Sequence, residues 1–358
     1  MSAAPRPSQS QRSASITRPR RILVRIPTWV GDAVMATPVL RALRAAHPQA
    51  EIVAEARPVL EDLLCGLSSF DRFLADPRAG ARGLLERSRR LRDAGFDWAV
   101  LLPDSQRAAL APALAGIPRR AGYARDPLRR LLLTDALPVP RSQGKRIAVP
   151  MTERYLRITR ALGVPDRGQA LELAVDDGAR ERVAQRLADH GVSVDEPIAV
   201  VTPGANFGGS KLWPTAHFAA ACDGLRRRLG LRAVLSPGPE EQEIARAIAG
   251  ASREDTVALV DPSPGLQELK ALVERSRLVL TNDTGPRHVA VALGRPAVVL
   301  MGPTDPAITH QHMERQRVLR EEVDCSPCQL KKCPIDHRCM TRLQPERAIA
   351  AAEELLAR

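Results

Sequence analysis

Residues 198–214 read IAVVTPGANFGGSKLWP, and this stretch decides the fold class of the chain. Ile198 to Val201 is a short run of apolar and β-branched residues, which is typical of a buried strand. A glycine-rich loop follows at once, and an apolar-periodic helix is expected at 216–229. A strand that passes through such a loop into a helix is the repeating unit of a parallel α/β sheet.

The same alternation continues on both sides of this stretch. Earlier strands, each followed by a helix, are expected at 21–26, 51–54 and 98–102. Later strands, again alternating with helices, are expected at 232–235, 256–260, 278–281 and 297–300. Residues 118–150 have an irregular and strongly basic pattern. The alternation predicts two doubly wound, Rossmann-like α/β domains, whose binding loops follow the carboxyl ends of the strands.

Four segments are expected along the chain. Residues 1–20 are rich in Ser, Arg, Pro and Gln and are predicted to form a disordered basic arm. Residues 163–178 lack clear periodicity, which places a domain boundary near 170 and gives domains at 21–170 and 171–344. A closing helix at 345–358 is expected to pack back toward the N-terminal domain.

Composition limits the function. The 358 residues are 44% hydrophobic, which is enough for two cores. The net charge of +12 suits an anionic partner, but aromatic residues make up only 3%. Stacking platforms for nucleic acid are therefore scarce, and nucleic acid is not an expected partner. No apolar run reaches the roughly 18 residues of a membrane helix, and no signal core follows the arm, so we expect a cytoplasmic protein.

The loop at 27–32, PTWVGD, ends a strand and begins a helix. Asp32 stands where a helix N-cap belongs, and capping alone is one explanation. The other is a general base, held between the flexible Gly31 and the indole of Trp29. Pro38 lies inside the helix expected at 32–46, which implies a kink or a later helix start.

The loop at 203–214 nearly matches a nucleotide-triphosphatase P-loop, because four residues separate Gly204 from Gly209. The match fails at the next step, where Ser210 precedes Lys211 instead of following it. Glycines and one ammonium group still suit an anion, so the loop is predicted to hold phosphate. The alternative is a turn that only positions the following helix.

The loop at 281–288, TNDTGPRH, is the third candidate. Asp283 and Thr284 can both cap the helix that follows, and Pro286 suits its first turn. The N-terminus of that helix offers an anion site, with His288 in its first turn. The alternative is that these residues are only a cap and a helix residue. The G-x-G-x-x-G fingerprint follows none of the expected strands, which disfavours hydride transfer.

These motifs resemble the ADP-heptose:lipopolysaccharide heptosyltransferases of glycosyltransferase family 9, and within them the heptosyltransferase II group. The matching stretches are PTWVGD at 27–32, GANFGGSKLWP at 204–214, NDTGPRH at 282–288, GPTDP at 302–306 and CSPCQLKKCPIDHRCM at 325–340. They span nearly all of the chain beyond the arm. One departure is Arg287, where methionine is expected; this arginine either alters the donor pocket or faces solvent.

The resemblance implies a GT-B fold, in which two Rossmann-like domains face each other across a cleft, with the acceptor in 21–170 and the ADP-sugar in 171–344. It implies inverting, metal-independent transfer from ADP-heptose to the lipid A-Kdo inner core, by a monomer without a cofactor. Asp32 corresponds to the base and Lys211 to the lysine that pairs with phosphate. The implied donor contacts, besides Lys211, are Gly204, Asn206, Ser210, Glu241, Asp283, Thr284, Gly285 and His288.

Other functions fit parts of this pattern. One is heptosyltransferase I or another family 9 transferase with a different acceptor. Another is a GT-B epimerase or a binding protein for sugar nucleotides, neither of which needs a base at Asp32.

An anionic membrane surface is an expected partner, with peripheral attachment to the inner face of the inner membrane. The basic residues that suggest it surround three leucines, 131–133; they are Arg119, Arg120, Arg125, Arg129, Arg130, Arg141, Lys145 and Arg146. The alternative is a solvated arginine-rich face with the leucines in the core.

The tail holds four cysteines near His337, and they are candidate zinc ligands: Cys325, Cys328, Cys333 and Cys339. Only the first pair has finger-like spacing, and the resembled family implies no metal. Free thiols are therefore the favoured interpretation.

Overall fold

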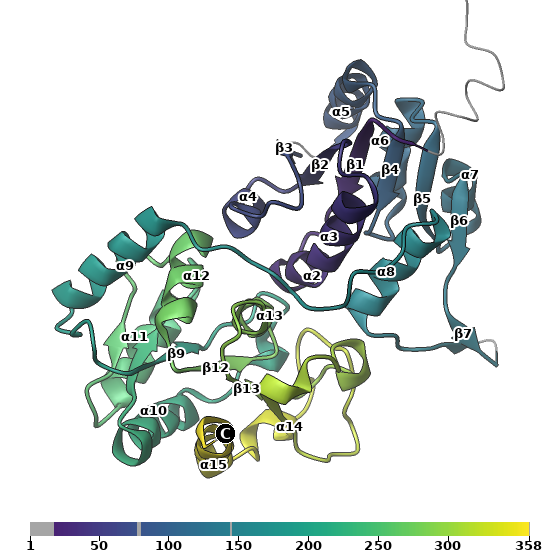
Figure 1. Ribbon diagram of the computed structural model, residues 1–358. Coiled ribbons are helices and arrows are strands. Elements are labelled where there is room, and N and C mark those ends of the chain that lie inside the picture. The colour runs from purple at the N-terminus through teal and green to yellow at the C-terminus, as the bar shows by residue number, and fades with distance from the viewer. Residues whose placement is uncertain (1–17, 77–79, 144, 358) are drawn as a thin grey trace, which may run out of the picture. The chain divides into compact units, whose positions relative to one another are not determined.

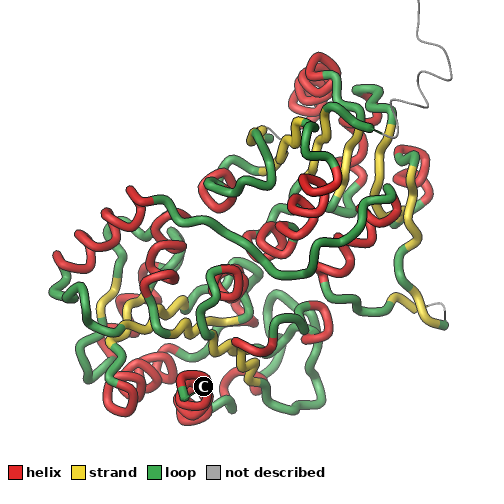
Figure 2. The backbone as a smooth tube through the Cα atoms, in the orientation of Figure 1, coloured by secondary structure: helices red, strands yellow, loops and turns green. Residues whose placement is uncertain are grey.

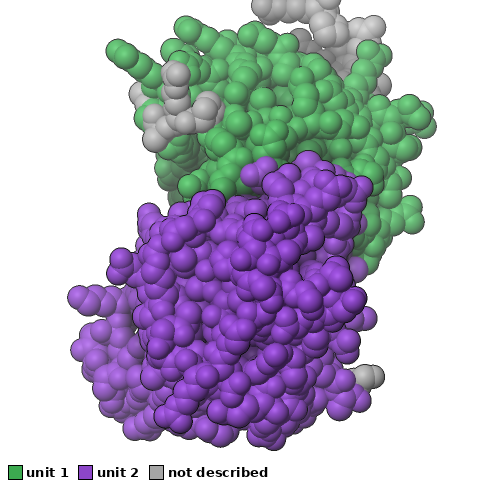
Figure 3. Space-filling view, turned by 90° about the vertical axis from the view of Figure 1, so that its left-hand side faces the viewer, with its two compact units in different colours: residues 1–61, 67–169 green, residues 62–66, 170–358 purple. Residues whose placement is uncertain are grey.

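The computed structural model describes residues 18–76, 80–143 and 145–357. The chain divides into two compact units: unit 1 is residues 1–61 with 67–169, and unit 2 is residues 62–66 with 170–358 (Figure 3). Each unit is built around a six-stranded sheet whose strands alternate with helices along the chain (Figures 1 and 2). The predicted pair of doubly wound α/β domains is confirmed.

Besides the strands of its six-stranded sheet, the first half of the chain contains two short strands that form a hairpin. Its elements in chain order are β1 (Arg21–Arg25), α2 (Val30–Met35), α3 (Thr37–Ala46), β2 (Glu51–Ala56), α4 (Leu60–Leu64), β3 (Arg72–Ala75), α5 (Gly80–Ala94), β4 (Trp98–Leu101), α6 (Gln106–Leu114), β5 (Arg119–Ala124), α7 (Pro127–Leu132), β6 (Asp135–Pro138), β7 (Arg141–Ser142), β8 (Lys145–Arg146) and α8 (Met151–Ala161).

The second half contains three short 3₁₀ helices, η1 to η3, among its strands and helices. Its elements in chain order are α9 (Asp177–Asp189), β9 (Ile198–Thr202), η1 (Gly209–Lys211), α10 (Thr215–Leu229), β10 (Arg232–Leu235), α11 (Gln242–Ala251), β11 (Val257–Ala258), α12 (Leu266–Arg275), β12 (Leu278–Asn282), α13 (Gly285–Ala292), β13 (Ala297–Leu300), η2 (Pro306–Ile308), η3 (Met313–Arg315), β14 (Gln316–Leu319), α14 (Arg338–Thr341) and α15 (Pro345–Leu356).

The two six-stranded sheets have the same topology. Their orders are β3-β2-β1-β4-β5-β6 and β11-β10-β9-β12-β13-β14, and neighbouring strands in both are parallel. The winding direction reverses between the first and fourth strands of each sheet, which is where ligands of such sheets bind. The loops after β1 and β4, and those after β9 and β12, therefore flank the two switch points.

Unit 2 encloses a continuous apolar core. Strands β9, β10, β12 and β13 are buried along their whole length, as expected for a parallel sheet covered on both faces. Trp213, at the end of the glycine-rich loop, packs edge-to-face against Phe218 of α10, with ring centres 5.0 Å apart. The loop is thus anchored to the core at the residue where it ends.

The region at 118–150 is more regular than its sequence indicates. It contains β5, α7 and β6 as well as the hairpin of β7 and β8. Arginines conceal the pattern of β5: Arg119 lies over the ring of Trp98, 4.8 Å from its centre, and pairs with Asp135 at 2.9 Å. Basic side chains that pack in this way give a strand no apolar alternation to detect.

Pro38 produces the later helix start that its position implies. The chain forms α2, turns at Ala36, and begins α3 with Pro38 in its first turn. Proline is tolerated there because the first N–H groups of a helix have no partner within the helix. The single helix expected at 32–46 is therefore two.

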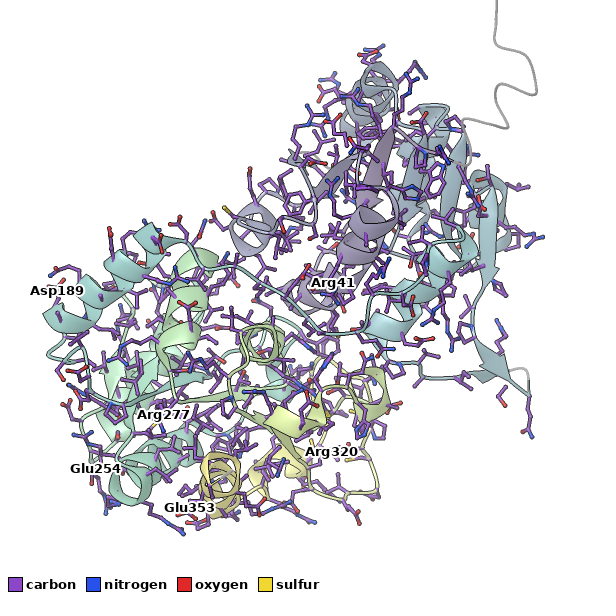
Figure 4. All side chains as sticks on the ribbon, in the orientation of Figure 1. Arg41, Asp189, Glu254, Arg277, Arg320 and Glu353 are labelled. Carbon is purple, nitrogen blue, oxygen red and sulfur yellow. The ribbon has the colours of Figure 1, made fainter. Side chains whose placement is uncertain are left out.

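The closing helix, which the sequence suggests packs back toward the N-terminal domain, belongs to unit 2. Helix α15 packs on α10, β13 and β14 of unit 2. Its Ala352 and Leu355 belong to the core of that unit. Its Glu353, labelled in Figure 4, pairs with Arg228 of α10 at 2.7 Å. The small residues of α15 let it lie close to α10 and complete the sheet's cover.

Candidate active site

The loops after β9 and β12 are tied together at their bases. Thr202 and Thr281 are register partners, and the hydroxyl of Thr202 donates to that of Thr281 at 2.6 Å. The side-chain amide of Asn282, which is fully buried, donates to the carbonyl oxygen of Pro203 at 2.7 Å. Sequence reasoning missed Asn282 as a structural tie, although a polar residue that ends an apolar strand was a visible signal.

The structure brings two predicted site residues, Lys211 and Asp283, into direct contact. The Nζ atom of Lys211 donates to Oδ2 of Asp283 at 2.9 Å and to its backbone carbonyl at 2.6 Å. The ammonium also lies 5.1 Å from the ring centre of Phe207, in the same loop. The glycine-rich loop and the loop after β12 therefore form one site.

Arg287 is the unexpected member of this site. It is 1% exposed, so the alternative that it faces solvent is excluded. Its Nη1 donates to Oδ1 of Asp283 at 2.9 Å, while the hydroxyl of Thr304 donates to Oδ2 at 2.7 Å. Sequence reasoning missed Thr304, which lies in the matched GPTDP stretch. Two cations thus share one carboxylate, and the three ionised groups sum to +1.

The charges around Asp283 keep it ionised. Burial by itself raises the pKa of this carboxyl, but Lys211, Arg287 and the hydrogen bond from Thr304 outweigh burial and hold the pKa below its ordinary range. Of the two residues that could cap α13, Thr284 is the N-cap, so the alternative that Asp283 is only a cap is excluded. Its carboxylate instead holds the two cations in place.

Gly285 begins α13, and His288 lies in its first turn. His288 is 7% exposed, and burial, followed by the charge of Arg287, lowers its pKa to about 3. The imidazole is therefore neutral at physiological pH. The positive end of the α13 dipole and the surplus cation of the Asp283 site lie at the same edge of the sheet.

Glu241 lies against the base of the glycine-rich loop. Its Oε2 accepts a hydrogen bond from the N–H of Gly238 at 2.8 Å, and a Cβ atom added to Gly204 would lie 1.6 Å from its Cδ. Only glycine at 204 leaves room for this carboxylate. Glu241, an implied donor contact, therefore lies beside the predicted phosphate loop.

Ser210 faces the cysteine-rich segment. It is buried, its N–H donates to the carbonyl of Lys331 at 3.1 Å, and its hydroxyl donates to the carbonyl of Leu330. Its own carbonyl lies 2.7 Å from Nε2 of His337. Ser210 thus supports the loop from behind, whereas Asn206 is exposed in the loop.

Asp32 lies in the first turn of α2, at the switch point of unit 1. The N-cap is Trp29, which is 50% exposed, so the alternative explanation of Asp32 as the helix cap is excluded. Burial raises the pKa of Tyr155 on α8 well above its usual value, and the charges of Asp32 and Asp104 add to that rise. Asp104 follows β4 and pairs with Arg154. Asp104, Arg154 and Tyr155 were not predicted from sequence.

A family model for glycosyltransferase family 9 (heptosyltransferase) matches residues 85–338. The chain belongs to glycosyltransferase family 9. It is 33% identical over 314 residues to lipopolysaccharide heptosyltransferase 2 of Salmonella typhimurium, covering 84% of this chain and 88% of that protein. The ADP-heptose lipopolysaccharide heptosyltransferase II of E. coli has a similar structure, with a TM-score of 0.76 and 28% identity, over 94% of this chain and 98% of that chain.

The fold extends to more distant members of family 9. A glycosyltransferase family 9 structure from Veillonella parvula has a TM-score of 0.80 at 23% identity and covers 94% of this chain and 97% of that chain. Likeness over nearly whole chains, with two six-stranded parallel sheets, confirms the GT-B class that the motifs imply for this family 9 chain.

The basic region of this family 9 glycosyltransferase divides between its core and its surface. Arg129 is fully buried and donates to the carbonyl of Tyr123 at 2.8 Å, so its expected place on an anionic interface is wrong. Leu133 is buried, but Leu131 of α7 is 80% exposed. None of the helices in the described ranges is both long and apolar enough to cross a bilayer.

The four cysteines of the tail line a single pocket with His337. All four thiols are free. Burial raises the pKa of Cys339 to about 11, and the other three cysteines add to the rise. Within the described part of the chain, no group of three or more His, Cys, Asp or Glu side chains is arranged to hold a metal ion. The zinc hypothesis therefore gains no support from the geometry.

Proposed function

We propose that this chain transfers heptose from ADP-heptose to the inner core of lipopolysaccharide, as a heptosyltransferase II. The observation that carries the proposal is the Asp283 site, where Lys211 and Arg287 share one buried carboxylate beside the N-terminus of α13. Its surplus positive charge suits the diphosphate of a sugar nucleotide. The 33% identity to a lipopolysaccharide heptosyltransferase 2 supports the same assignment.

The diphosphate and the ribose of the donor each have a matching group in unit 2. Lys211 and the N-terminus of α13 bind the diphosphate, and Glu241 accepts hydrogen bonds from the ribose hydroxyls. As the bond to the sugar breaks, negative charge grows on the departing ADP. Lys211 and the helix terminus stabilise that charge, a role that a divalent metal has in other transferases.

In the proposed reaction, Asp32 removes the proton from an acceptor hydroxyl as its oxygen attacks the anomeric carbon of the heptose. Attack comes from the face opposite the diphosphate. The new carbon–oxygen bond forms while the bond to the diphosphate breaks, and ADP leaves with the bonding electrons. The configuration at the anomeric carbon is therefore inverted.

The proposed acceptor is the lipid A-Kdo inner core, which carries phosphate and carboxylate groups. Such an acceptor lies at the anionic cytoplasmic face of the inner membrane, and peripheral attachment there is part of the proposal. Support comes from α7 and the residue range around it, where Leu128 and Leu131 are exposed together with Arg125 and Arg130. Exposed leucines among arginines suit an anionic lipid surface.

The test is to incubate the protein with ADP-heptose and with defined inner-core acceptors that carry either no heptose or one heptose, with mass readout. A gain of one heptose on the singly substituted acceptor only is the expected result. Transfer to the acceptor without heptose would indicate heptosyltransferase I. Conversion of ADP-heptose to an isomer with both acceptors unchanged would indicate an epimerase and would overturn the proposal.

A further inference from the structure

Asp283 holds one cation on each of its oxygens. Lys211 and the hydroxyl of Thr304 occupy Oδ2, at 2.9 and 2.7 Å, and Arg287 occupies Oδ1 at 2.9 Å. The Asp283 side chain is 8% exposed, so water contributes little to the solvation of its carboxylate. Its stability in the fold depends on these partners.

Donor binding creates a conflict at this carboxylate. Lys211 must turn some of its hydrogen bonds toward the diphosphate, and it weakens its hold on Asp283 as it does so. The incoming diphosphate is itself an anion that the carboxylate repels. A buried carboxylate that loses its only cation while an anion arrives would resist the change. Without a second cation on Asp283, its hold on Lys211 would therefore weaken donor binding.

Arg287 is held in place by residues other than Lys211 and Asp283. Its Nε donates to Oε1 of Gln316 at 2.6 Å, and its Nη1 and Nη2 donate to the hydroxyl and carbonyl of Thr309 at 2.9 and 3.1 Å. Gln316 is held in turn, since its Nε2 donates to the carbonyl of His312 at 3.0 Å. Arg287 is thus anchored between β14 and the segment after η2, and it stays on Asp283 when Lys211 moves.

We propose that Arg287 is a positioning residue, which neutralises Asp283 and thereby releases Lys211 to the diphosphate of the donor. The inference rests on the proposed function of this site, because it requires a diphosphate ligand. Arg287 does not touch the donor in this arrangement. It sets the strength with which Lys211 is retained by the protein.

The experiment measures the binding of ADP and of adenosine by calorimetry to the wild type, Arg287→Met, Arg287→Lys and the double variant Arg287→Met/Asp283→Asn. Arg287→Met is expected to weaken ADP binding by about 10- to 100-fold, since Lys211 then remains on Asp283. Adenosine binding, which involves no phosphate, should change less than about threefold. Arg287→Lys should recover part of the loss, because it retains the charge without the fork geometry.

The double variant gives the decisive outcome. Asp283→Asn removes the charge that holds Lys211 and leaves only the hydrogen bond to the backbone carbonyl of residue 283, so ADP affinity should return to within about threefold of the wild type. Loss of structure alone would weaken ADP and adenosine together and would not be rescued by Asp283→Asn. The matched control is Arg228→Met on α10, which breaks an exposed pair with Glu353 of α15 and should leave both affinities unchanged.

The results separate this inference from the proposed function. A wild type that binds no ADP would refute the proposed function and the inference with it. A wild type that binds ADP, together with an Arg287→Met variant that binds it equally well, would refute the inference alone. If Arg287→Met does not fold, the Arg287→Lys and double variants still decide: loss of ADP affinity without rescue in the double variant would overturn the proposal.

Discussion

Units 1 and 2 share one strand order but balance charge differently at the carboxyl ends of their strands. In unit 1, Glu55 is fully buried, and its carboxylate accepts hydrogen bonds from Nε and Nη2 of Arg87 at 2.5 and 2.6 Å. Arg25 lies 3.6 Å from the same carboxylate and pairs with Asp76 at 2.6 Å. Two cations meet two carboxylates, and the charges cancel. In unit 2, two cations meet one carboxylate.

This difference separates a structural network from a binding site built on the same scaffold. A buried network whose charges cancel has no electrostatic need for a further partner, and it holds its strands and helices rigidly. A network with one surplus cation is completed only when an anion arrives. The unit 1 network is therefore expected to stabilise its sheet, and the unit 2 network to bind ligand.

The largest expected effect belongs to Asp32, which lies outside both networks. Asp32→Asn should lower kcat by about 10² to 10⁴, because the acceptor hydroxyl loses its base. ADP affinity should stay nearly intact, since the donor groups lie in unit 2. Steady-state kinetics and ADP calorimetry on the same preparation check both parts. Full activity of the variant would remove Asp32 from the mechanism.

Loss of a cation from the unit 1 network, whose charges cancel, should lower the stability of the fold. Arg87→Met leaves Glu55 with less compensation in a buried place, and it should lower the free energy of unfolding by about 3 to 5 kcal/mol. ADP affinity of the fraction that remains folded should not change. Urea denaturation and calorimetry at low temperature measure the two quantities. A variant with normal stability and weakened ADP binding would reverse the roles assigned to the two networks.

Loss of a cation from the unit 2 network, which has one surplus positive charge, should weaken ligand binding more than it weakens the fold. Lys211→Met should weaken ADP binding by about 10- to 100-fold. Its effect on unfolding should be smaller than that of Arg87→Met, because Arg287 and Thr304 still compensate Asp283. The same pair of measurements applies. Equal ADP affinity in wild type and variant would show that the surplus charge has no part in donor binding.

A pH effect should follow from His288, which borders the surplus network. Burial keeps it neutral in the folded protein, with a pKa of about 3, whereas the unfolded chain takes up the proton near 6.5. The stability linked to this difference is present above pH 6.5 and is lost as the pH falls from 6.5 toward 3. At pH 5 the loss is about 2 kcal/mol. His288→Gln should show a correspondingly smaller fall between pH 7.5 and 5 in urea denaturation; an equal fall would contradict the assignment.

The smallest expected effect is on membrane binding by the exposed residues of α7 in unit 1. Arg130→Glu and Leu131→Glu on α7 should each reduce binding to vesicles that contain anionic lipid by about threefold to tenfold, and kcat on a detergent-dispersed acceptor should not change. Arg228→Glu on α10 is the control for charge reversal elsewhere. Binding by the wild type that is insensitive to salt would argue against an electrostatic attachment.

Local pattern was sufficient to predict the strands at the switch points and the residues next to them. Asp283 follows the apolar strand β12 directly, and Lys211 lies in the glycine-rich loop after β9, so both could be found in the sequence. Arg287 and Arg129 could not be placed, because arginine is seldom buried and its burial here depends on partners distant in the chain. Gln316, for example, lies 29 residues beyond Arg287. Only the tertiary fold shows that such residues meet.

The contact between Gly204 and Glu241 has a consequence for the evolution and redesign of the donor pocket. Any side chain at 204 would displace the carboxylate at 241, since the added carbon would lie 1.6 Å from its Cδ. The two positions are therefore not independent: a larger residue at 204 is compatible only with a shorter one at 241. Libraries that vary position 204 alone would drive most side chains into Glu241, whereas paired changes could reach pockets for other nucleotides.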